Sequence, residues 1–143
     1  MPAKENKIIN NANDNIGWFF DKPEKSSIFF PLKKNYPEFN EFSVINPIII
    51  SDVLKNFCEF KSINLKFPND IFVNRKKICG ILQEIVKFKG NTFIIVGIGI
   101  NIQQSPNIKN YPTTHLSVYN DKITKMTIFK KIKKCYENEL ICI

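Results

Sequence analysis

Residues 65–82 read LKFPNDIFVNRKKICGIL, a stretch in which polar side chains twice interrupt apolar runs. Pro68 ends strand pairing, and Asn69 and Asp70 have side chains that readily hydrogen-bond to the backbone of a turn. The flanking runs are rich in β-branched and aromatic residues, which favour strands. The sequence therefore predicts two short strands joined by this turn, over residues 63–67 and 71–74.

The chain downstream of these strands has the pattern of a meander. Arg75 and Lys76 are expected to form a hairpin tip that leads into a strand over residues 77–88. The segment KGN at 89–91 is a second turn signal, and a strand over residues 92–102 follows it. The β-branched content of both long segments favours strands over a helix.

Two other segments have apolar residues at helical spacing. In residues 41–57 the apolar positions recur every four residues, and Pro47 is expected in the first turn, where its missing N–H costs little. Near the C-terminus an apolar face opposes several lysines, with Thr124 or Thr127 as the N-cap. The apolar positions of the two predicted helices are Ile45, Ile49, Val53 and Phe57, and then Ile128, Phe129, Ile132, Tyr136 and Leu140.

A strand over residues 26–32 precedes the first helix, so the predicted order is strand, helix, four strands, helix. This order predicts an α+β (α/β) fold, in which helices flank a mixed, mostly antiparallel β-sheet. We expect one domain over residues 1–143, because a chain of this length can bury a core of its own. Residues 1–17 are polar and asparagine-rich and are interpreted as a flexible loop, and residues 103–114 as a connecting loop.

The composition argues against several classes of protein. No apolar run is long enough to span a membrane, and the N-terminus lacks the apolar core of a secretory signal, so we expect a cytoplasmic protein with no membrane partner. Four cysteines without a CxxC pair, together with a single histidine, argue against a structural zinc site.

The net charge of +8 suggests nucleic-acid binding, but the kinds of basic residue argue against it. Of the 21 basic residues only Arg75 is an arginine, and lysine is the weaker choice for bidentate recognition of bases or phosphate. We therefore expect no nucleic-acid partner. A basic surface can still steer an acidic partner or an anionic nucleotide toward the protein.

The segment GIGIN at residues 97–101 adds a further signal. Gly97 and Gly99 alternate inside a β-branched strand, which weakens packing unless something must approach the backbone closely. Each polar interruption taken alone fits an ordinary turn or hairpin tip. Together with these glycines, the interruptions indicate a sheet that positions ligand-binding groups.

These motifs resemble the catalytic domain of biotin protein ligase, the biotin–acetyl-CoA-carboxylase ligase family. That family carries Lys-Trp-Pro-Asn-Asp, a hairpin with Lys-x-x-Gly-Ile-Leu, and then Gly-x-Gly-x-Asn. Here the matching segments are KFPND, KICGIL and GIGIN, with Phe67 in place of the tryptophan. The resemblance covers roughly residues 16–140 and is specific over 66–101. It implies a biotin/lipoate protein ligase-like fold; lipoate ligases share the architecture, but the Pro-Asn-Asp block favours the biotin branch.

The resemblance implies an activity as well as a fold. Members of the family join biotin to ATP, giving biotinyl-5′-adenylate and pyrophosphate, and pass the biotinyl group to a lysine of a biotin carboxyl carrier domain. The implied ligands are biotin, ATP and Mg²⁺, and the implied partner is a carboxylase's carrier domain. The attack of a carboxylate on a phosphate brings two anions together, so this chemistry needs a fixed cation.

The resemblance assigns the catalytic roles to Lys77 and Asp70. Lys77 matches the lysine that contacts the biotin carboxylate and an α-phosphate oxygen. Asp70 and Asn69 match the acidic turn near the ribose and phosphates, where Asp70 would hold Mg²⁺ or receive a proton in the second step. Lys66 lies beside them in the sequence and would add positive potential.

The remaining implied contacts divide between biotin and ATP. Gly80 matches a glycine that lets the biotin ring lie close, and Trp18 matches a tryptophan that closes over the adenylate. Gly97 and Gly99 would leave room for the nucleotide, and Asn101 matches the asparagine that hydrogen-bonds to adenine.

The family carries a Ser-Thr-Asn segment and an arginine- and glycine-rich loop further upstream. The stretch at the loop's position, INNANDNIG at 9–17, has no arginine and one glycine. We therefore expect an N-terminally truncated catalytic domain with no DNA-binding domain and no C-terminal SH3-like domain. Three interpretations stay open: a fragment, a diverged and weaker ligase, or a non-catalytic remnant that binds nucleotide, biotin or a carrier domain. The oligomeric state also stays open.

Overall fold

The computed structural model describes residues 17–22, 25–57, 63–66 and 68–141, with the side chains of residues 18–22 and 141 excepted. Most of residues 1–17, interpreted above as a loop, lie outside this part, and Gly17 opens a strand instead. The strands are β1 (Gly17–Lys22), β2 (Lys25–Pro31), β3 (Ile63–Lys66), β4 (Asp70–Val73), β5 (Lys76–Phe88) and β6 (Asn91–Ile100). The helices are α2 (Phe42–Phe57) and α3 (Lys125–Ile141), with short 3-10 turns η1 (Phe39–Glu41) and η2 (Leu116–Val118).

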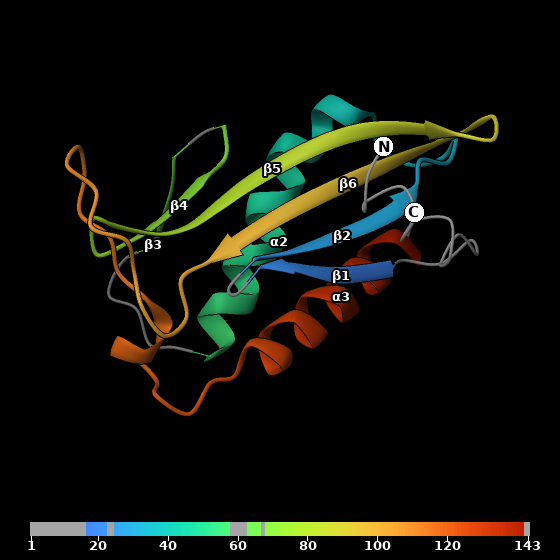
Figure 1. Cartoon of the computed structure of the whole chain (residues 1–143). Helices are drawn as coiled ribbons and strands as arrows, with labels where there is room; N and C mark the ends of the chain where they lie inside the picture. The colour runs from blue at the N-terminus through green and yellow to red at the C-terminus, as the bar shows by residue number, and fades with distance from the viewer. Residues whose placement is uncertain (1–16, 23–24, 58–62, 67, 142–143) are drawn as a thin grey trace.

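The described strands form one six-stranded sheet in the order β1-β2-β6-β5-β4-β3 (Figure 1). Every neighbouring pair of these strands is antiparallel. The one isolated parallel bridge among the described residues joins Lys77 of β5 to Thr113, which lies outside the named strands. The predicted fold class is therefore confirmed, with β1 as an additional edge strand that the sequence did not predict.

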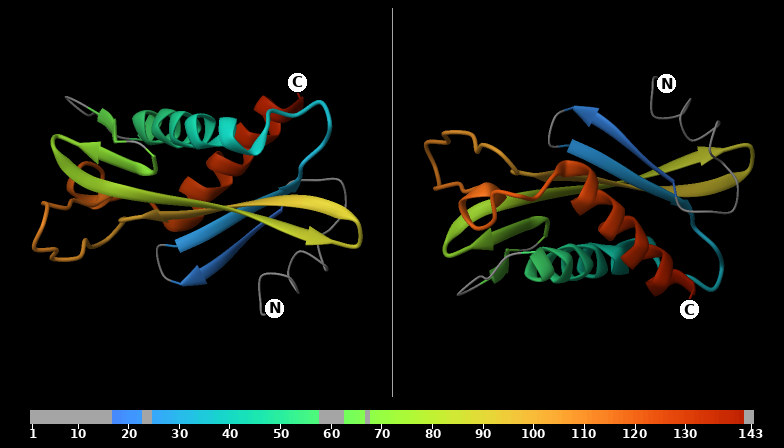
Figure 2. Two further views of the ribbon diagram at one scale, coloured as in Figure 1. Left: turned by 90° about the horizontal axis from the view of Figure 1, so that it is seen from above. Right: turned by 90° about the horizontal axis from the view of Figure 1, so that it is seen from below.

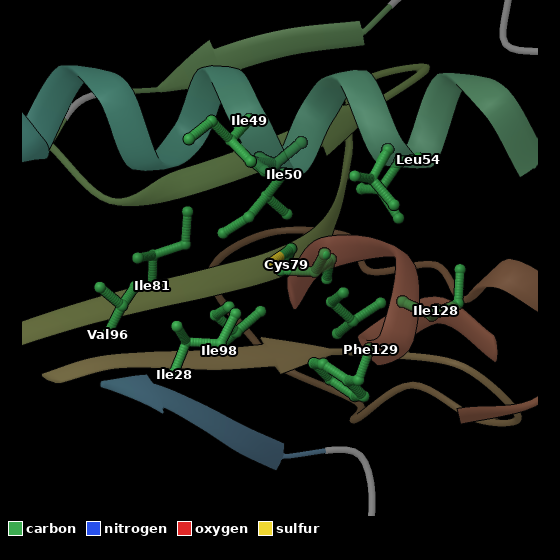
Figure 3. Close-up of a cluster of buried hydrophobic side chains, with 14 of the residues drawn as sticks. Ile28, Ile49, Ile50, Leu54, Cys79, Ile81, Val96, Ile98, Ile128 and Phe129 are labelled. Carbon is green, nitrogen blue, oxygen red and sulfur yellow. The ribbon is translucent and has the colours of Figure 1, made fainter. Parts of the chain in front are cut away.

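Both helices pack on the same face of the sheet (Figure 2). In the core, Ile49, Ile50 and Leu54 of α2 lie over side chains of β5 and β6 (Figure 3). Ile128 and Phe129 of α3 complete the same cluster. No helix among the described residues covers the opposite face, where alternate residues of β2, β5 and β6 point.

The C-terminal helix begins where the sequence predicted. Thr124 is its N-cap, because its hydroxyl oxygen accepts a hydrogen bond from the Thr127 backbone N–H at 3.2 Å. The predicted apolar face is buried in full, at Ile128, Phe129, Ile132, Tyr136 and Leu140. Burial of this face holds α3 against α2 and the sheet.

The start of α2 differs from the prediction. The helix begins at Phe42, so Pro47 lies in its second turn and not in its first. The 3-10 turn η1 runs directly into α2 and is closed by a capping box between Glu38 and Glu41, which moves the helix start upstream. The helix tolerates Pro47 with its ring buried against the core side.

Both predicted hairpins of the meander form, and each turns through two residues of positive φ. Lys89 and Gly90 have φ of 48° and 78°, as the KGN signal predicted. The other tip is at Asn74 and Arg75, with φ of 49° and 67°, one residue earlier than predicted. Two-residue turns of this kind match the twist of the flanking strands, which explains the preference for Asn at the first position.

The described residues bear on the predictions about membrane spans and about the cysteines. None of the described helices is long and apolar enough to cross a bilayer. Within the same part of the chain, Cys79 is buried, Cys135 is half-buried and both are free thiols, whereas Cys58 and Cys142 lie outside it.

Candidate functional site

A pocket of about 540 Å³ lies on the sheet, with the loop over residues 103–114 forming one wall. Strands β2, β5 and β6 and the turn before β4 supply most of its lining. Seven of the nine predicted site residues line it: Asn69, Asp70, Lys77, Gly80, Gly97, Gly99 and Asn101. The sequence motifs that are separated along the chain thus meet at one place.

An ion pair between Lys77 and Asp70 lies in this pocket. Lys77 Nζ is 3.1 Å from Asp70 Oδ1, and the two side chains are 22% and 27% exposed. Lys77 also donates to the Tyr111 hydroxyl at 3.5 Å, and its ammonium lies 5.3 Å from the centre of the Tyr111 ring. An acid and an aromatic face therefore hold the ammonium, while the group keeps access to solvent and to a ligand.

Lys77 is in its charged form at neutral pH. Burial by itself would lower the pKa of Lys77, but the hydrogen bond and charge of Asp70, with a smaller contribution from Tyr111, outweigh it and raise the pKa above its ordinary value. The group can therefore stabilise negative charge on a ligand, and it is not suited to act as a base at this pH.

A β-bulge aims Lys77 into the pocket. Phe72 pairs with Lys77 while Ile71 pairs with Cys79, which leaves Ile78 as an extra residue on β5. In a regular strand Lys77 and Gly80 would point to opposite faces, since they are three positions apart. The bulge brings them to the same face, so a Cβ built on Gly80 would lie 3.6 Å from Lys77 Nζ.

The backbone of Lys77 is pinned to the loop over residues 103–114. The Lys77 N–H donates to the Pro112 carbonyl at 2.9 Å, and the Thr114 N–H donates to the Lys77 carbonyl at 2.9 Å. Asn101 ties β6 to the same region, because its N–H donates to the Ile78 carbonyl at 2.9 Å and its side-chain amide donates to the Thr114 carbonyl at 3.2 Å. These bonds satisfy the backbone that the bulge leaves unpaired.

The floor of the pocket is a row of residues in register across four strands. Lys25 of β2 pairs with Gly99, Gly99 pairs with Gly80, and Gly80 pairs with Asp70 of β4. A Cβ on Gly80 or Gly99 would find its nearest neighbours at 3.6 Å and 3.8 Å, which is ordinary contact. The fold therefore has room for a side chain at both positions, and glycine leaves this room to the pocket.

Gly97, in the next row, has a different reason to be glycine. It pairs with Leu82 and Ser27, and a Cβ built on it would lie 3.3 Å from the Leu82 carbonyl oxygen. The close approach of a neighbouring backbone thus restricts this position even without a ligand.

One predicted residue whose side chain is described, Lys66, does not line the pocket. Lys66 pairs with Asp70, one strand further along the row, and its ammonium lies 5.4 Å from the centre of the Phe72 ring. Trp18 is opposite Ile28 in the edge strand β1, and its side chain lies outside the described residues.

Sequence reasoning missed several lining residues. Lys25, Ser26 and Ser27 reach the pocket because β2 pairs with β6, a long-range pairing that no local pattern reveals. Tyr111 does not line the pocket but contacts Lys77: it comes from a stretch that reads only as loop, and the bridge between Lys77 and Thr113 brings this stretch to the site. The sequence predicted a strand over residues 26–32, but its local pattern does not indicate that this strand reaches the pocket.

A sequence model of the Biotin/lipoate A/B protein ligase family matches residues 26–101. The "Bifunctional ligase/repressor BirA" of Bacillus subtilis is 35% identical over 80 residues, which are 52% of this chain and 25% of that protein. The protein of the same name from Escherichia coli K12 is 30% identical over 77 residues, 53% of this chain and 24% of its own length.

Solved structures show the same fold. The biotin protein ligase of Aquifex aeolicus in complex with biotin and ATP superposes with a TM-score of 0.61 at 21% identity, over 82% of this chain and 50% of that one. The Leishmania major biotin protein ligase in complex with biotin gives 0.65 at 19% identity, over 78% and 51%. This chain thus spans about a quarter of the curated relatives and about half of these structures.

Proposed function

The chain belongs to the biotin/lipoate A/B protein ligase family, and on this premise we propose that it activates biotin with ATP and transfers the biotinyl group to a lysine of a biotin carboxyl carrier domain. The relatives named as ligases and the fold shared with biotin-bound and ATP-bound proteins support this proposal. The proposed setting is the cytoplasm.

In the first step, an oxygen of the biotin carboxylate attacks the α-phosphorus of ATP. A new P–O bond forms, the bond from the α-phosphorus to the bridging oxygen breaks, and pyrophosphate leaves. Both reactants are anions, so a cation must be present where they meet. We assign this role to Lys77, and the support is that its ammonium is charged, partly buried and held on a strand by Asp70 and Tyr111.

In the second step, the amine of the carrier lysine attacks the acyl carbon of the adenylate, and AMP leaves. The amine loses a proton, and Asp70 is the pocket carboxylate next to Lys77 that would receive it. Asn69 and Asn101 would fix the nucleotide at the same edge of the sheet, and the bare backbone at Gly80, Gly97 and Gly99 would let biotin and the nucleotide lie flat on the strands.

Magnesium would enter with ATP. The described residues contain no group of three or more metal-ligating side chains. A single carboxylate such as Asp70 fits Mg²⁺ that is otherwise bound by phosphate oxygens and water. When bound, the ion would offset part of the phosphate charge, and Asp70 would exchange part of its contact with Lys77 for it.

The observation that carries the proposal is the Lys77–Asp70 pair at one end of a glycine-floored pocket of about 540 Å³. The test is pyrophosphate release from Mg·ATP by the purified chain, with and without biotin. Biotin-dependent release is expected. As a control, lipoate added in place of biotin should leave the rate of pyrophosphate release at the level measured without biotin. Release that is independent of biotin, or no release at high protein concentration, would overturn the proposal of catalysis.

The second candidate is a binding module that holds biotin or nucleotide without turnover. The observation that favours it is the charge of the pocket: its lining cations among the described residues are Lys25 and Lys77, and the only arginine, Arg75, lies at a hairpin tip outside the pocket. Calorimetry that shows biotin or ATP binding in a chain that releases no pyrophosphate would support this candidate over the first.

A further inference from the structure

Two lysines line the pocket, Lys25 and Lys77, and Asp70 forms its ion pair with Lys77. The charged residues that line the pocket are Lys25, Asp70, Lys77 and Glu84. Lys77 forms its ion pair with Asp70 at 3.1 Å. Among the described residues, Lys25 has no ion-pair partner, and its side chain is exposed to the pocket and to solvent. An anionic ligand in this pocket therefore meets one free ammonium in addition to the paired one.

The position of Lys25 follows from the register of the sheet. Lys25 pairs with Gly99, so it stands at one end of the row whose other end is Asp70. Its side chain lies across the glycine floor, since its Cγ and Cε are 3.8 Å and 4.0 Å from a Cβ built on Gly99. The backbones of Lys25 and Gly80 are two strands apart, about 10 Å. A ligand that lies across the row meets Lys25 at one end and Lys77 at the other.

Polar groups of β2 extend this end of the pocket. Ser26 and Ser27 line it next to Lys25 and are 2% and 1% exposed. Ser27 pairs with Gly97, so its side chain is on the same face as Lys25, whereas Ser26 pairs with Ile98 and its side chain is on the helix-covered face. Ser27 therefore adds a hydroxyl to the pocket side of β2 next to Lys25, where a polar, anionic group fits better than an apolar ring.

We propose that Lys25 binds the polyphosphate of the nucleotide, at the end of the pocket opposite Asp70. This inference rests on the proposed function, which supplies ATP as the ligand, and it adds a residue of β2 to the site. The triphosphate carries several negative charges, and Lys77 shares its own charge with Asp70. Lys25 supplies the second cation, which positions the phosphates while the α-phosphate faces Lys77.

The test measures ligand binding by calorimetry for the wild type, Lys25→Gln and the matched control Lys87→Gln. Lys87 is an exposed lysine of β5 that does not line the pocket. The probes are ATP with Mg²⁺, adenosine, and biotin, each alone. Loss of a charge-assisted contact should weaken ATP binding about tenfold to a hundredfold in Lys25→Gln. Adenosine and biotin binding should change less than twofold, and Lys25→Arg should restore ATP binding.

The outcomes separate this inference from the proposed function. ATP binding by Lys25→Gln within twofold of Lys87→Gln would overturn the role of Lys25 and leave the proposed function intact. Weaker biotin binding with unchanged ATP binding would overturn the assignment to phosphate as well. A wild type that binds neither ATP nor biotin would overturn both proposals. Equal unfolding transitions of the two variants in urea would show that the change lies in binding and not in folding.

Discussion

Tyr136 of α3 donates a hydrogen bond of 2.6 Å to the side-chain oxygen of Asn46 in α2, inside the core. The Asn46 amide in turn donates to the Gln83 side-chain oxygen at 2.8 Å, and the Gln83 amide donates to the Phe39 carbonyl at 2.9 Å. Gln83 belongs to β5, the strand that carries Lys77 and Gly80. A buried polar chain thus joins both helices to the strand at the centre of the site.

This chain of hydrogen bonds predicts a cost for Tyr136→Phe. The substitution leaves the Asn46 oxygen without its donor in the core, which should lower the free energy of unfolding by about 1–3 kcal/mol. Urea unfolding monitored by circular dichroism measures the change. The control is Tyr36→Phe, at a half-buried tyrosine, which should change stability by less than about 0.5 kcal/mol. Equal stability of both variants would contradict the role of the network.

The buried thiol of Cys79 predicts how stability depends on pH. Burial raises the pKa of Cys79 far above its ordinary value, with Lys77 opposing and Asp70 adding to the rise. The folded chain therefore keeps the proton when the unfolded chain loses it, so this contribution to stability is complete below about pH 8.5 and decreases as the pH rises further. The loss should approach about 1.4 kcal/mol per pH unit.

Urea unfolding at pH 8 and at pH 10 measures this effect, and Cys79→Ala is the variant for comparison. The variant is expected to be less stable at both pH values because it leaves a small cavity, but its stability should fall less between them. An identical fall in the wild type and in Cys79→Ala would show that the thiol does not contribute.

Two glycines of the pocket should respond differently to alanine. In Gly80→Ala the new Cβ has its nearest neighbours at 3.6 Å, so the free energy of unfolding should stay within about 1 kcal/mol of the wild type. In Gly97→Ala the Cβ would press on the Leu82 carbonyl at 3.3 Å, and a loss of about 1–3 kcal/mol is expected.

Gly80→Ala should weaken ligand binding although it has little effect on stability. Its methyl group occupies the floor of the pocket beside Lys77 and Asp70, so biotin or ATP binding should weaken at least about tenfold although the fold is intact. Calorimetry on the folded variant measures this. Unchanged binding of both ligands would mean that the floor at Gly80 is not a ligand surface.

Tyr111 predicts a graded effect on catalysis. Tyr111→Phe loses the 3.5 Å hydrogen bond to Lys77 and keeps the ring 5.3 Å from the ammonium, whereas Tyr111→Leu loses both. The rate of adenylate formation should fall about twofold to fivefold in the first and about tenfold in the second, as expected for a cation–π contact of about 1 kcal/mol added to a weak hydrogen bond. Equal rates for Tyr111→Leu and the wild type would remove Tyr111 from the site.

The sequence predicted the helices and the meander well because their signals are local. The apolar spacing from Ile128 to Leu140 and the KGN turn each act within a few residues, and both formed as expected. Strand β1 was missed because its short apolar run follows an asparagine-rich stretch. Its pairing with β2 forms only in the assembled sheet and leaves no local pattern.

Sequence reasoning identified the pocket residues that belong to a motif and missed those that only the tertiary structure brings to the pocket. Asp70, Lys77 and Gly80 lie close in sequence, and they share one pocket. The bulge at Ile78, which turns Lys77 toward Gly80, depends on backbone bonds to the loop at Pro112 and Thr114, and no local pattern encodes it. Lys66 is close to Asp70 in sequence, but it lies on the adjacent strand β3 and does not line the pocket.

The central claim is that the Lys77 ammonium stabilises the meeting of the biotin carboxylate and the α-phosphate. The most direct measurement is the single-turnover rate of biotinyl-adenylate formation by wild type, Lys77→Met and the control Lys87→Met. We predict a loss of at least about a hundredfold in Lys77→Met, as for removal of one charged group that contacts the transition state, and no change in Lys87→Met. Formation of the adenylate by Lys77→Met at the wild-type rate would contradict the account.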